Sequence, residues 1–160
     1  MAVLRAALKG QDRLQADERE LRRSGPSFSV DTLQEFRSEY GPQRPLVLLL
    51  GVDAFAGLPA WHRWQALFEL AHIGVLTRPG HNPVFTDALQ REVQARRIDS
   101  VESIAATPAG HIIDIAVSAL EISATHIRSE LAAGREPRYL VADALINDAA
   151  LLAPYRVGSM

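Results

Sequence analysis

Two hydroxyls and a guanidinium lie within one short stretch, "ISATHIR", at residues 122–128. Ser123 is a residue type that caps helices, and Thr125 and Arg128 are close enough in sequence to share one face of a helix that starts there. The backbone N–H groups and the dipole at a helix N-terminus favour a bound phosphate. A cation at this end is unfavourable by about 0.3–1 kcal/mol, a penalty that a bound polyphosphate would reverse. The stretch therefore predicts a phosphate site, and a capped helix with a surface arginine is the alternative.

A second set of polar or small residues follows apolar runs that we expect to be strands. Gly51 and Asp53 come after "PLVLLL", and Arg78 comes after "HIGVLT". In open α/β sheets, ligands bind beyond the carboxyl ends of the strands. Gly51 would let a ligand approach the backbone, and Asp53 could accept hydrogen bonds from a sugar. The alternative is that Gly51 makes a turn and Asp53 caps the next helix.

The tryptophans offer a surface for a planar ligand. Pro59 suits the first turn of a helix, so Trp61 is expected at the exposed N-terminal end, where a ring could stack. Trp64 lies one turn further in and is expected in the core. The histidines are scattered without the spacing of a metal site, and the sequence holds no P-loop, zinc motif or G-x-S-x-G elbow. We therefore predict no metal site built by the protein alone.

Strand-like runs alternate with amphipathic segments, which predicts an α/β fold with a parallel sheet. A run that is apolar at every position predicts a strand at 45–51, buried on both faces, and largely apolar runs predict strands at 72–77 and 111–117. A polar strand is expected near 13–17, and a Pro/Gly loop at 78–83. Helices are expected over 2–9, 30–40 (capped by Ser29 or Asp31), 58–71, 84–97, from Ser123 onward, and about 141–152.

Composition excludes several classes of protein. The 160 residues predict one domain, and 48% hydrophobic with 22% charged residues is typical of a globular protein. A net charge of −2 gives no electrostatic footprint for nucleic acid, and no apolar run is long enough to span a membrane. The absence of cysteine fits a cytoplasmic protein. We therefore expect neither a nucleic-acid partner nor a membrane.

Several stretches together resemble the bacterial nicotinate-nucleotide adenylyltransferase family, whose members are also called nicotinate mononucleotide adenylyltransferases. The matching segments are "GPSFSVDTL", the G-x-D and W-x-x-W patterns of residues 51–64, "LAHIGVLTRPG", "ISATHIR" and "YLVADALI". The resemblance implies a Rossmann-like nucleotidyltransferase fold over residues 1–160 as a single domain. It also implies transfer of the adenylyl group of ATP to nicotinate mononucleotide, which gives deamido-NAD and pyrophosphate in NAD biosynthesis, with Mg²⁺ accompanying ATP.

The resemblance assigns roles to residues of this chain. Ring stacking is implied for Trp61, and carboxylate binding by backbone N–H groups is implied near Ser29 and His62. The family commonly has S-Y-T where this chain has "SFS", and Ser29 can still supply its N–H. ATP binding is implied for Ser123, Thr125, Arg128, Gly51 and Asp53.

The front of the family's pattern does not occur in this sequence. The family opens with a strand, a G-x-F-x-P-x-H turn and an H-x-G-H motif, so no catalytic residue is assigned here. We expect the N-terminal βαβ portion to be missing, which would leave a slot roughly 10 Å wide and an apolar edge on the 45–51 strand. The chain would then be a fragment or an internally started reading of a longer enzyme. The alternatives are a non-catalytic nucleotide-binding remnant and a stand-alone α/β domain.

Overall fold

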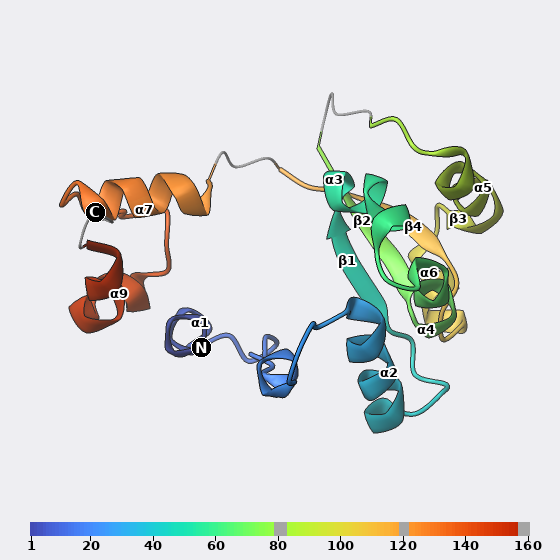
Figure 1. The fold of residues 1–160 in the computed structure, drawn as a ribbon, viewed down its shortest axis with the longest axis horizontal. Helices are drawn as coiled ribbons and strands as arrows, with labels where there is room; N and C mark the ends of the chain where they lie inside the picture. The colour runs from blue at the N-terminus through green and yellow to red at the C-terminus, as the bar shows by residue number, and fades with distance from the viewer. Residues whose placement is uncertain (79–82, 119–121, 157–160) are drawn as a thin grey trace. The chain divides into compact units, whose positions relative to one another are not determined.

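The computed structural model describes residues 1–78, 83–118 and 122–156 (Figure 1). The chain divides into two units. The helical unit comprises Met1–Arg22 with Leu120–Met160, and the sheet unit comprises Arg23–Ala119. The expectation of one domain over residues 1–160 stays a prediction, and each unit is described by itself.

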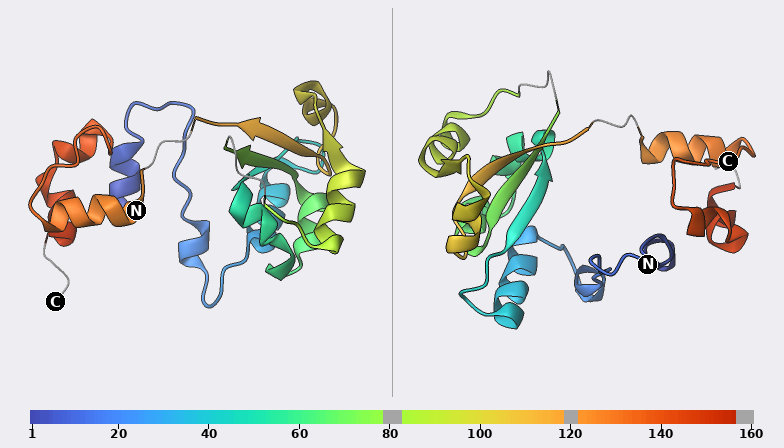
Figure 2. Two further views of the ribbon diagram at one scale, coloured as in Figure 1. Left: turned by 90° about the horizontal axis from the view of Figure 1, so that it is seen from above. Right: turned by 180° about the vertical axis from the view of Figure 1, so that it is seen from behind.

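The sheet unit is built on a parallel sheet, which Figure 2 shows from two further sides. Among the described residues the sheet has four strands in the order β1-β2-β4-β3, and every pair is parallel. The strands are β1 (Val47–Gly51), β2 (His72–Thr77), β3 (Arg97–Ile98) and β4 (Ile112–Ala116). The predicted α/β class and the strands at 45–51, 72–77 and 111–117 are therefore confirmed. The short β3 was not predicted.

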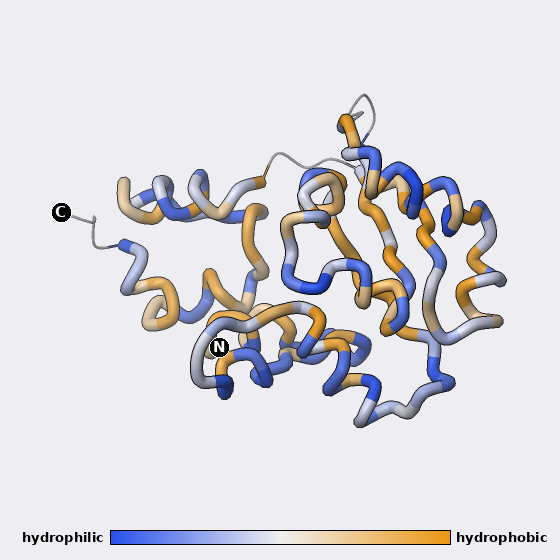
Figure 3. Tube along the Cα trace, turned by 45° about the vertical axis from the view of Figure 1, so that its right-hand side comes forward, coloured by the Kyte–Doolittle hydropathy of each residue, from blue (hydrophilic) through white to orange (hydrophobic). Residues whose placement is uncertain are grey.

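The helices of the sheet unit supply side chains to the core on one face of this sheet, except the last of them, which has no buried residue. They are α2 (Ser29–Tyr40), α3 (Val52–Ala56), α4 (Leu67–Leu70), α5 (Asp87–Arg96) and α6 (Val101–Ala106), with the 3-10 turns η2 (Leu58–Ala60) and η3 (Trp64–Ala66). The strands are largely hydrophobic (orange in Figure 3). Their core side chains include Leu50, Ile73, Val75 and Ile112, which cluster with buried Phe55, Phe68 and Leu89 from the helices.

The β1 strand is buried on one face only. It lies at the end of the strand order, and Val47 and Leu49 are 42% and 56% exposed. The prediction that 45–51 is buried on both faces is therefore wrong, whereas an apolar edge on this strand was expected and is present. Gly74, on the neighbouring strand, allows Leu49 to approach closely, because a Cβ at Gly74 would stand 2.6 Å from Leu49 Cδ2.

The continuous helix predicted over 58–71 is also wrong. The segment is broken into η2, η3 and α4, with Pro59 in the first turn of η2 and Arg63 at φ 51° before η3. A left-handed backbone conformation cannot continue a right-handed helix. Trp61 and Trp64 therefore do not share one helical stripe, and Trp64 packs edge-on against Phe68 at 6.1 Å between ring centroids.

The helical unit has a small core of its own. Its elements are α1 (Ala2–Ala7), η1 (Arg19–Arg22), α7 (Ala124–Ala132), α8 (Asp143–Ile146) and α9 (Ala149–Arg156). Buried Leu131, Leu145 and Leu152 come from the three C-terminal helices. The single helix expected over 141–152 is instead two helices, because Asp148 Oδ1 accepts a hydrogen bond from the N–H of Ala150 at 3.2 Å and restarts the helix.

The polar strand expected near 13–17 is wrong, because its charged residues pair locally instead of joining a sheet. The Arg19 guanidinium donates to both carboxylate oxygens of Asp17 at 2.8 and 2.7 Å, and this lowers the pKa of Asp17 to about 2. Arg5 pairs with Glu18 at 2.5 Å. The predicted loop at 78–83 lies mostly outside the described residues. None of the helices in the described parts of the chain has the length and apolar run needed to cross a membrane.

Candidate functional site

A hollow in the sheet unit brings together residues from two separate parts of the sequence. Ser29, Trp61 and His62 all line one cavity of about 310 Å³, which we name the ring pocket. The start of α2 supplies one wall, and the segment after η2 supplies the other. The remaining lining residues are Ser27, Phe28, Ala60 and Leu67.

The wall at α2 presents a helix N-terminus to the ring pocket. Ser29 is the first residue of α2, and the N-cap position is taken by Phe28 in an extended conformation, so the predicted caps Ser29 and Asp31 are both wrong. Phe28 caps with no side-chain hydrogen bond. The first N–H groups of a helix have no acceptor within the helix and carry the positive end of its dipole. This wall can therefore receive a carboxylate.

Aromatic rings lie on both walls of the ring pocket. The Phe28 ring lies 4.4 Å from the His62 ring, centroid to centroid, with the planes tilted by 31°. Trp61 is half-buried and ends η2 in an extended conformation, with its N–H bonded to the Leu58 carbonyl at 2.9 Å. A planar ring with an attached carboxylate fits this combination of aromatic faces and free helix N–H groups. Sequence reasoning missed Phe28, although its place beside Ser29 was a signal.

A second hollow lies where β1, β2 and β4 end. It measures about 160 Å³ and is lined by Gly51, Asp53 and Arg78 together with Val52, Leu76 and Val117. The structure thus brings to one hollow the three residues that the strand-end rule singles out, Gly51, Asp53 and Arg78. Gly51 is the N-cap of α3 at φ −63°, and a Cβ there would meet nothing within 4 Å, so neither backbone nor packing demands glycine. Asp53 lies in the first turn of α3 and not at its N-cap, which is Gly51.

A larger hollow of about 450 Å³ adjoins this one through Val52 and Arg78. Arg97 and Asp114 form an ion pair on its polar side. Phe85 and Phe55, edge-to-face at 5.4 Å, form its apolar side. Sequence reasoning missed Arg97 and Asp114, although an aspartate inside the apolar run "HIIDIAV" was an available signal.

The residues predicted to bind an anion lie in the helical unit. Ser123 is the N-cap of α7, and its Oγ accepts a hydrogen bond from the His126 N–H at 3.1 Å, which confirms the predicted cap. An Arg128 nitrogen lies 3.5 Å from Thr125 Oγ1, so these two side chains are neighbours on the helix. The first turn of α7 carries no acidic residue, and Ser123, Thr125 and Arg128 are all exposed.

Metal-ligand clusters are absent from the parts of the chain that the structure describes. No group of three or more His, Cys, Asp or Glu side chains could hold an ion there. Mg²⁺ is commonly bound through one or two carboxylates and the phosphates of a nucleotide. Asp53 at the strand ends is a carboxylate of the kind that fits such a nucleotide-borne ion.

Comparisons with known proteins point to one family. The family described as cytidylyltransferase-like matches residues 1–130. A protein of Pseudomonas syringae pv. tomato named "Probable nicotinate-nucleotide adenylyltransferase" is 42% identical over 146 residues, which is 91% of this chain and 65% of that protein. Proteins with the same name from Methylococcus capsulatus and Pseudomonas aeruginosa are 46% and 41% identical, over 82% and 92% of this chain.

These relatives are longer than this chain. It spans 65% of the P. syringae protein, 62% of the M. capsulatus protein and 68% of the P. aeruginosa protein. The matched region includes the ring pocket and the hollow at the strand ends, which both lie within residues 1–130.

Proposed function

The chain belongs to the cytidylyltransferase-like family, within the nicotinate-nucleotide adenylyltransferases, and from this membership we propose that it binds ATP and nicotinate mononucleotide as substrates of an adenylyl transfer. The observation that carries the proposal is the ring pocket, where Ser29, Trp61 and His62 meet in one hollow of about 310 Å³. An aromatic face beside a helix N-terminus suits a flat ring that bears a negative charge.

In this proposal the ring pocket takes the nicotinate half of the mononucleotide. Trp61 stacks on the pyridine ring, because its indole is half-buried and lines the hollow. The carboxylate receives hydrogen bonds from backbone N–H groups at Ser29 and His62. A carboxamide has no charge for the dipole of α2 to attract, so the acid form of the mononucleotide is preferred over the amide.

The ATP half uses the other candidate residues. Ser123, Thr125 and Arg128 hold phosphates at the N-terminus of α7, where a bound anion removes the unfavourable placing of a cation near that end. Gly51 and Asp53 line the nucleotide side at the strand ends, where Asp53 accepts hydrogen bonds from a ribose. Asp53 would help to hold the Mg²⁺ that accompanies ATP, and the ion would neutralise part of the phosphate charge.

The reaction step follows from these positions. A phosphate oxygen of the mononucleotide attacks the α-phosphorus of ATP and forms a new P–O bond. The bond between the α-phosphorus and the oxygen that bridges to the β-phosphorus breaks, and pyrophosphate leaves with that oxygen. The protein contributes position and electrostatic stabilisation, on which such transfers mainly depend.

A nucleotide-binding protein without turnover is the second candidate. The observation that favours it is that the histidines at 62, 72, 81, 111 and 126 form no H-x-G-H motif. In the family that this chain resembles, that motif supplies the side chains that stabilise charge on the transferring phosphate.

Calorimetry combined with a pyrophosphate-release assay tests both candidates. We expect saturable binding of ATP and of nicotinate mononucleotide, with nicotinamide mononucleotide about tenfold weaker because it lacks the carboxylate. Binding together with pyrophosphate release supports the adenylyltransferase. Binding without release supports the second candidate, and no binding of either ligand at millimolar concentration contradicts both.

A further inference from the structure

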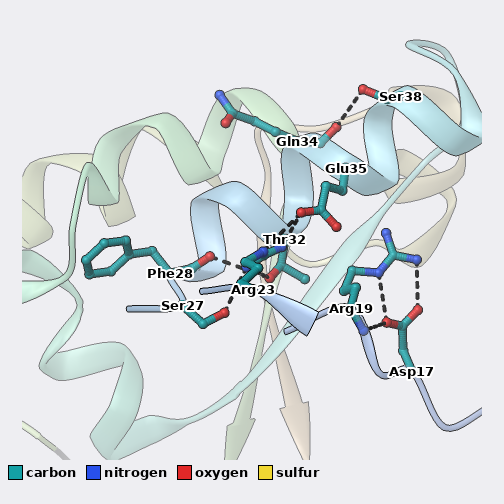
Figure 4. A network of polar contacts seen from close by, with 9 residues as sticks. All are labelled: Asp17, Arg19, Arg23, Ser27, Phe28, Thr32, Gln34, Glu35 and Ser38. Atoms are coloured by element: carbon teal, nitrogen blue, oxygen red, sulfur yellow. Dashed lines mark hydrogen bonds and ion pairs between the residues drawn. The ribbon is translucent and has the colours of Figure 1, made fainter. Parts of the chain in front are cut away.

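One guanidinium ties the wall of the ring pocket to the helix behind it. Arg23 donates from one terminal nitrogen to Ser27 Oγ at 2.8 Å and to Thr32 Oγ1 at 2.9 Å. Its Nε and its other terminal nitrogen donate to Glu35 Oε1 at 3.0 and 2.7 Å. Figure 4 shows these groups converging on Arg23 from the loop before α2 and from α2 itself.

The Arg23 side chain is only 16% exposed, so these hydrogen bonds take the place of most of its water. Arginine presents its N–H donors in a planar fork, whereas lysine presents a compact ammonium that cannot reach acceptors on separate sides with the same geometry. The contacts with Ser27, Thr32 and Glu35 therefore require the guanidinium and not only a positive charge.

The network fixes the residues that form the pocket wall. Ser27 lines the ring pocket, and it is the residue before Phe28, the N-cap of α2. Thr32 Oγ1 also lies 3.5 Å from the Phe28 carbonyl, to which it donates. Arg23 thereby holds the loop on both sides of the N-cap, and with it the direction of the Ser29 N–H and the contact of the Phe28 ring with His62.

We propose that Arg23 is a positioning residue for the ring pocket, which sets the N-terminus of α2 in the orientation that receives the carboxylate of the ring ligand. This inference rests on the proposed function, because the ligand is the nicotinate group. Arg23 is not among the residues that line the pocket. It acts through Ser27 and Thr32 and does not touch the ligand.

The test is a fluorescence titration of the full chain with nicotinate mononucleotide, in which stacking on Trp61 quenches the emission. Arg23→Gln is expected to raise the dissociation constant about tenfold. Arg23→Lys keeps a positive charge beside Glu35 but loses the planar guanidinium. This variant is therefore expected to melt at the temperature of the wild type but to bind nicotinate mononucleotide as weakly as Arg23→Gln. Equal affinity of the Arg23→Gln protein and the wild type overturns the inference.

Arg91→Gln is the matched control, because Arg91 is an exposed arginine on α5 whose Nε donates to the Asp87 carbonyl at 3.2 Å, and it lines none of the hollows described above. It makes the same change of charge, and we expect wild-type affinity. A tenfold loss in the control as well would trace the effect to net charge and overturn the role of Arg23.

Hydrogen exchange in the absence of ligand separates this inference from the proposed function. Arg23→Gln is expected to speed exchange of the backbone N–H groups of Asp31 and Thr32, which bond to the Phe28 carbonyl, while β2 keeps its protection. If the wild type shows no saturable quenching, the proposed function fails, and the exchange data still decide whether Arg23 holds the wall. Unchanged exchange at Asp31 and Thr32 overturns the positioning role.

Discussion

His72 Nδ1 accepts a hydrogen bond from the backbone N–H of His111 at 3.1 Å, while the other ring nitrogen lies 2.8 Å from the Thr107 carbonyl oxygen. A nitrogen that accepts cannot carry a proton, so Nε2 carries it and donates to Thr107. The side chain is fully buried. The fold therefore holds His72 as a neutral imidazole with both nitrogens bonded.

This arrangement predicts a loss of stability in mild acid. Burial lowers the pKa of His72 below its ordinary value of 6.5, the charges of His111 and Arg37 lower it further, and the bond to Thr107 opposes the shift. Below pH 6.5 the unfolded chain binds a proton at His72, whereas the folded chain does not until the pH is lower. The stabilising contribution of His72 is therefore fully present above pH 6.5 and is lost as the pH falls below it. The free energy of unfolding should decrease by at most ~1.4 kcal/mol per pH unit from this group.

Urea unfolding at pH 7.5, 6.5 and 5.5 measures the effect. His72→Gln removes the titrating group, so the loss of stability between pH 6.5 and 5.5 should be smaller than in the wild type. His126→Gln, at an exposed histidine of α7, serves as the control and should keep the wild-type slope. An identical slope in wild type and His72→Gln would contradict the prediction.

Substitution by lysine should have very different effects on stability at the adjacent positions Leu49 and Leu50. Leu49 is 56% exposed on the edge strand β1, whereas Leu50 is 8% exposed and belongs to the core. Leu49→Lys should change the free energy of unfolding by less than about 0.5 kcal/mol, because surface substitutions usually do. It should also raise solubility, since a lysine on an open strand edge opposes edge-to-edge pairing.

Leu50→Lys is the matched variant, and it should destabilise the protein by several kcal/mol, on the order of 3 kcal/mol or more, because it buries an unpaired charge. Urea unfolding and light scattering against protein concentration measure both variants. Equal stability of the two would mean that the alternation of faces along β1 is wrong.

The features predicted correctly from the sequence are those whose cause is local. Largely apolar runs predicted the strands around Ile73 and Ile112, and the residue type of Ser123 predicted the cap of α7. The predicted helix over 58–71 is broken at Arg63, which has a left-handed backbone conformation that arginine rarely adopts. No sequence pattern indicated this break. Phe28 takes the N-cap of α2 because the Arg23 network holds the loop before it, and this network joins residues that no short motif connects.

The candidate site likewise has features that the sequence could predict and features that it could not. The meeting of Gly51, Asp53 and Arg78 followed from a general rule about the carboxyl ends of parallel strands. The meeting of Trp61 with Ser29 did not follow from spacing, because helical periodicity carries no information across two separate elements. That part of the prediction depended on the resemblance to a family.

Alanine substitutions at Trp61 and Trp64 should affect different properties, ligand affinity at Trp61 and stability at Trp64. Trp61 lines the ring pocket, and Trp64 packs on Phe68. Trp61→Ala should weaken binding of nicotinate mononucleotide about tenfold or more, because stacking of an aromatic base contributes ~1–3 kcal/mol. Calorimetry measures this without depending on tryptophan emission.

Trp64→Ala serves as the comparison for that measurement. It should lower the free energy of unfolding by about 2 kcal/mol, since the side chain is half-buried, and leave the affinity within about twofold. A loss of affinity in Trp64→Ala equal to that in Trp61→Ala would show that both act through the fold and would remove the stacking role of Trp61.

Arg128 and Arg135 provide the sharpest test of the anion site. Arg128 lies beside Thr125 near the N-terminus of α7, whereas Arg135 follows the helix and forms two hydrogen bonds with Glu130, both at 2.7 Å. Arg128→Ala should weaken ATP binding about tenfold, because a charge-assisted hydrogen bond to phosphate contributes roughly 1.5–3 kcal/mol. Without ATP it should leave α7 as stable or slightly more stable, since a cation near a helix N-terminus is unfavourable. Arg135→Ala removes the same charge and should leave ATP affinity unchanged. Titration calorimetry at two salt concentrations measures both variants, and equal ATP affinity of the two would leave α7 as a capped helix with a surface arginine.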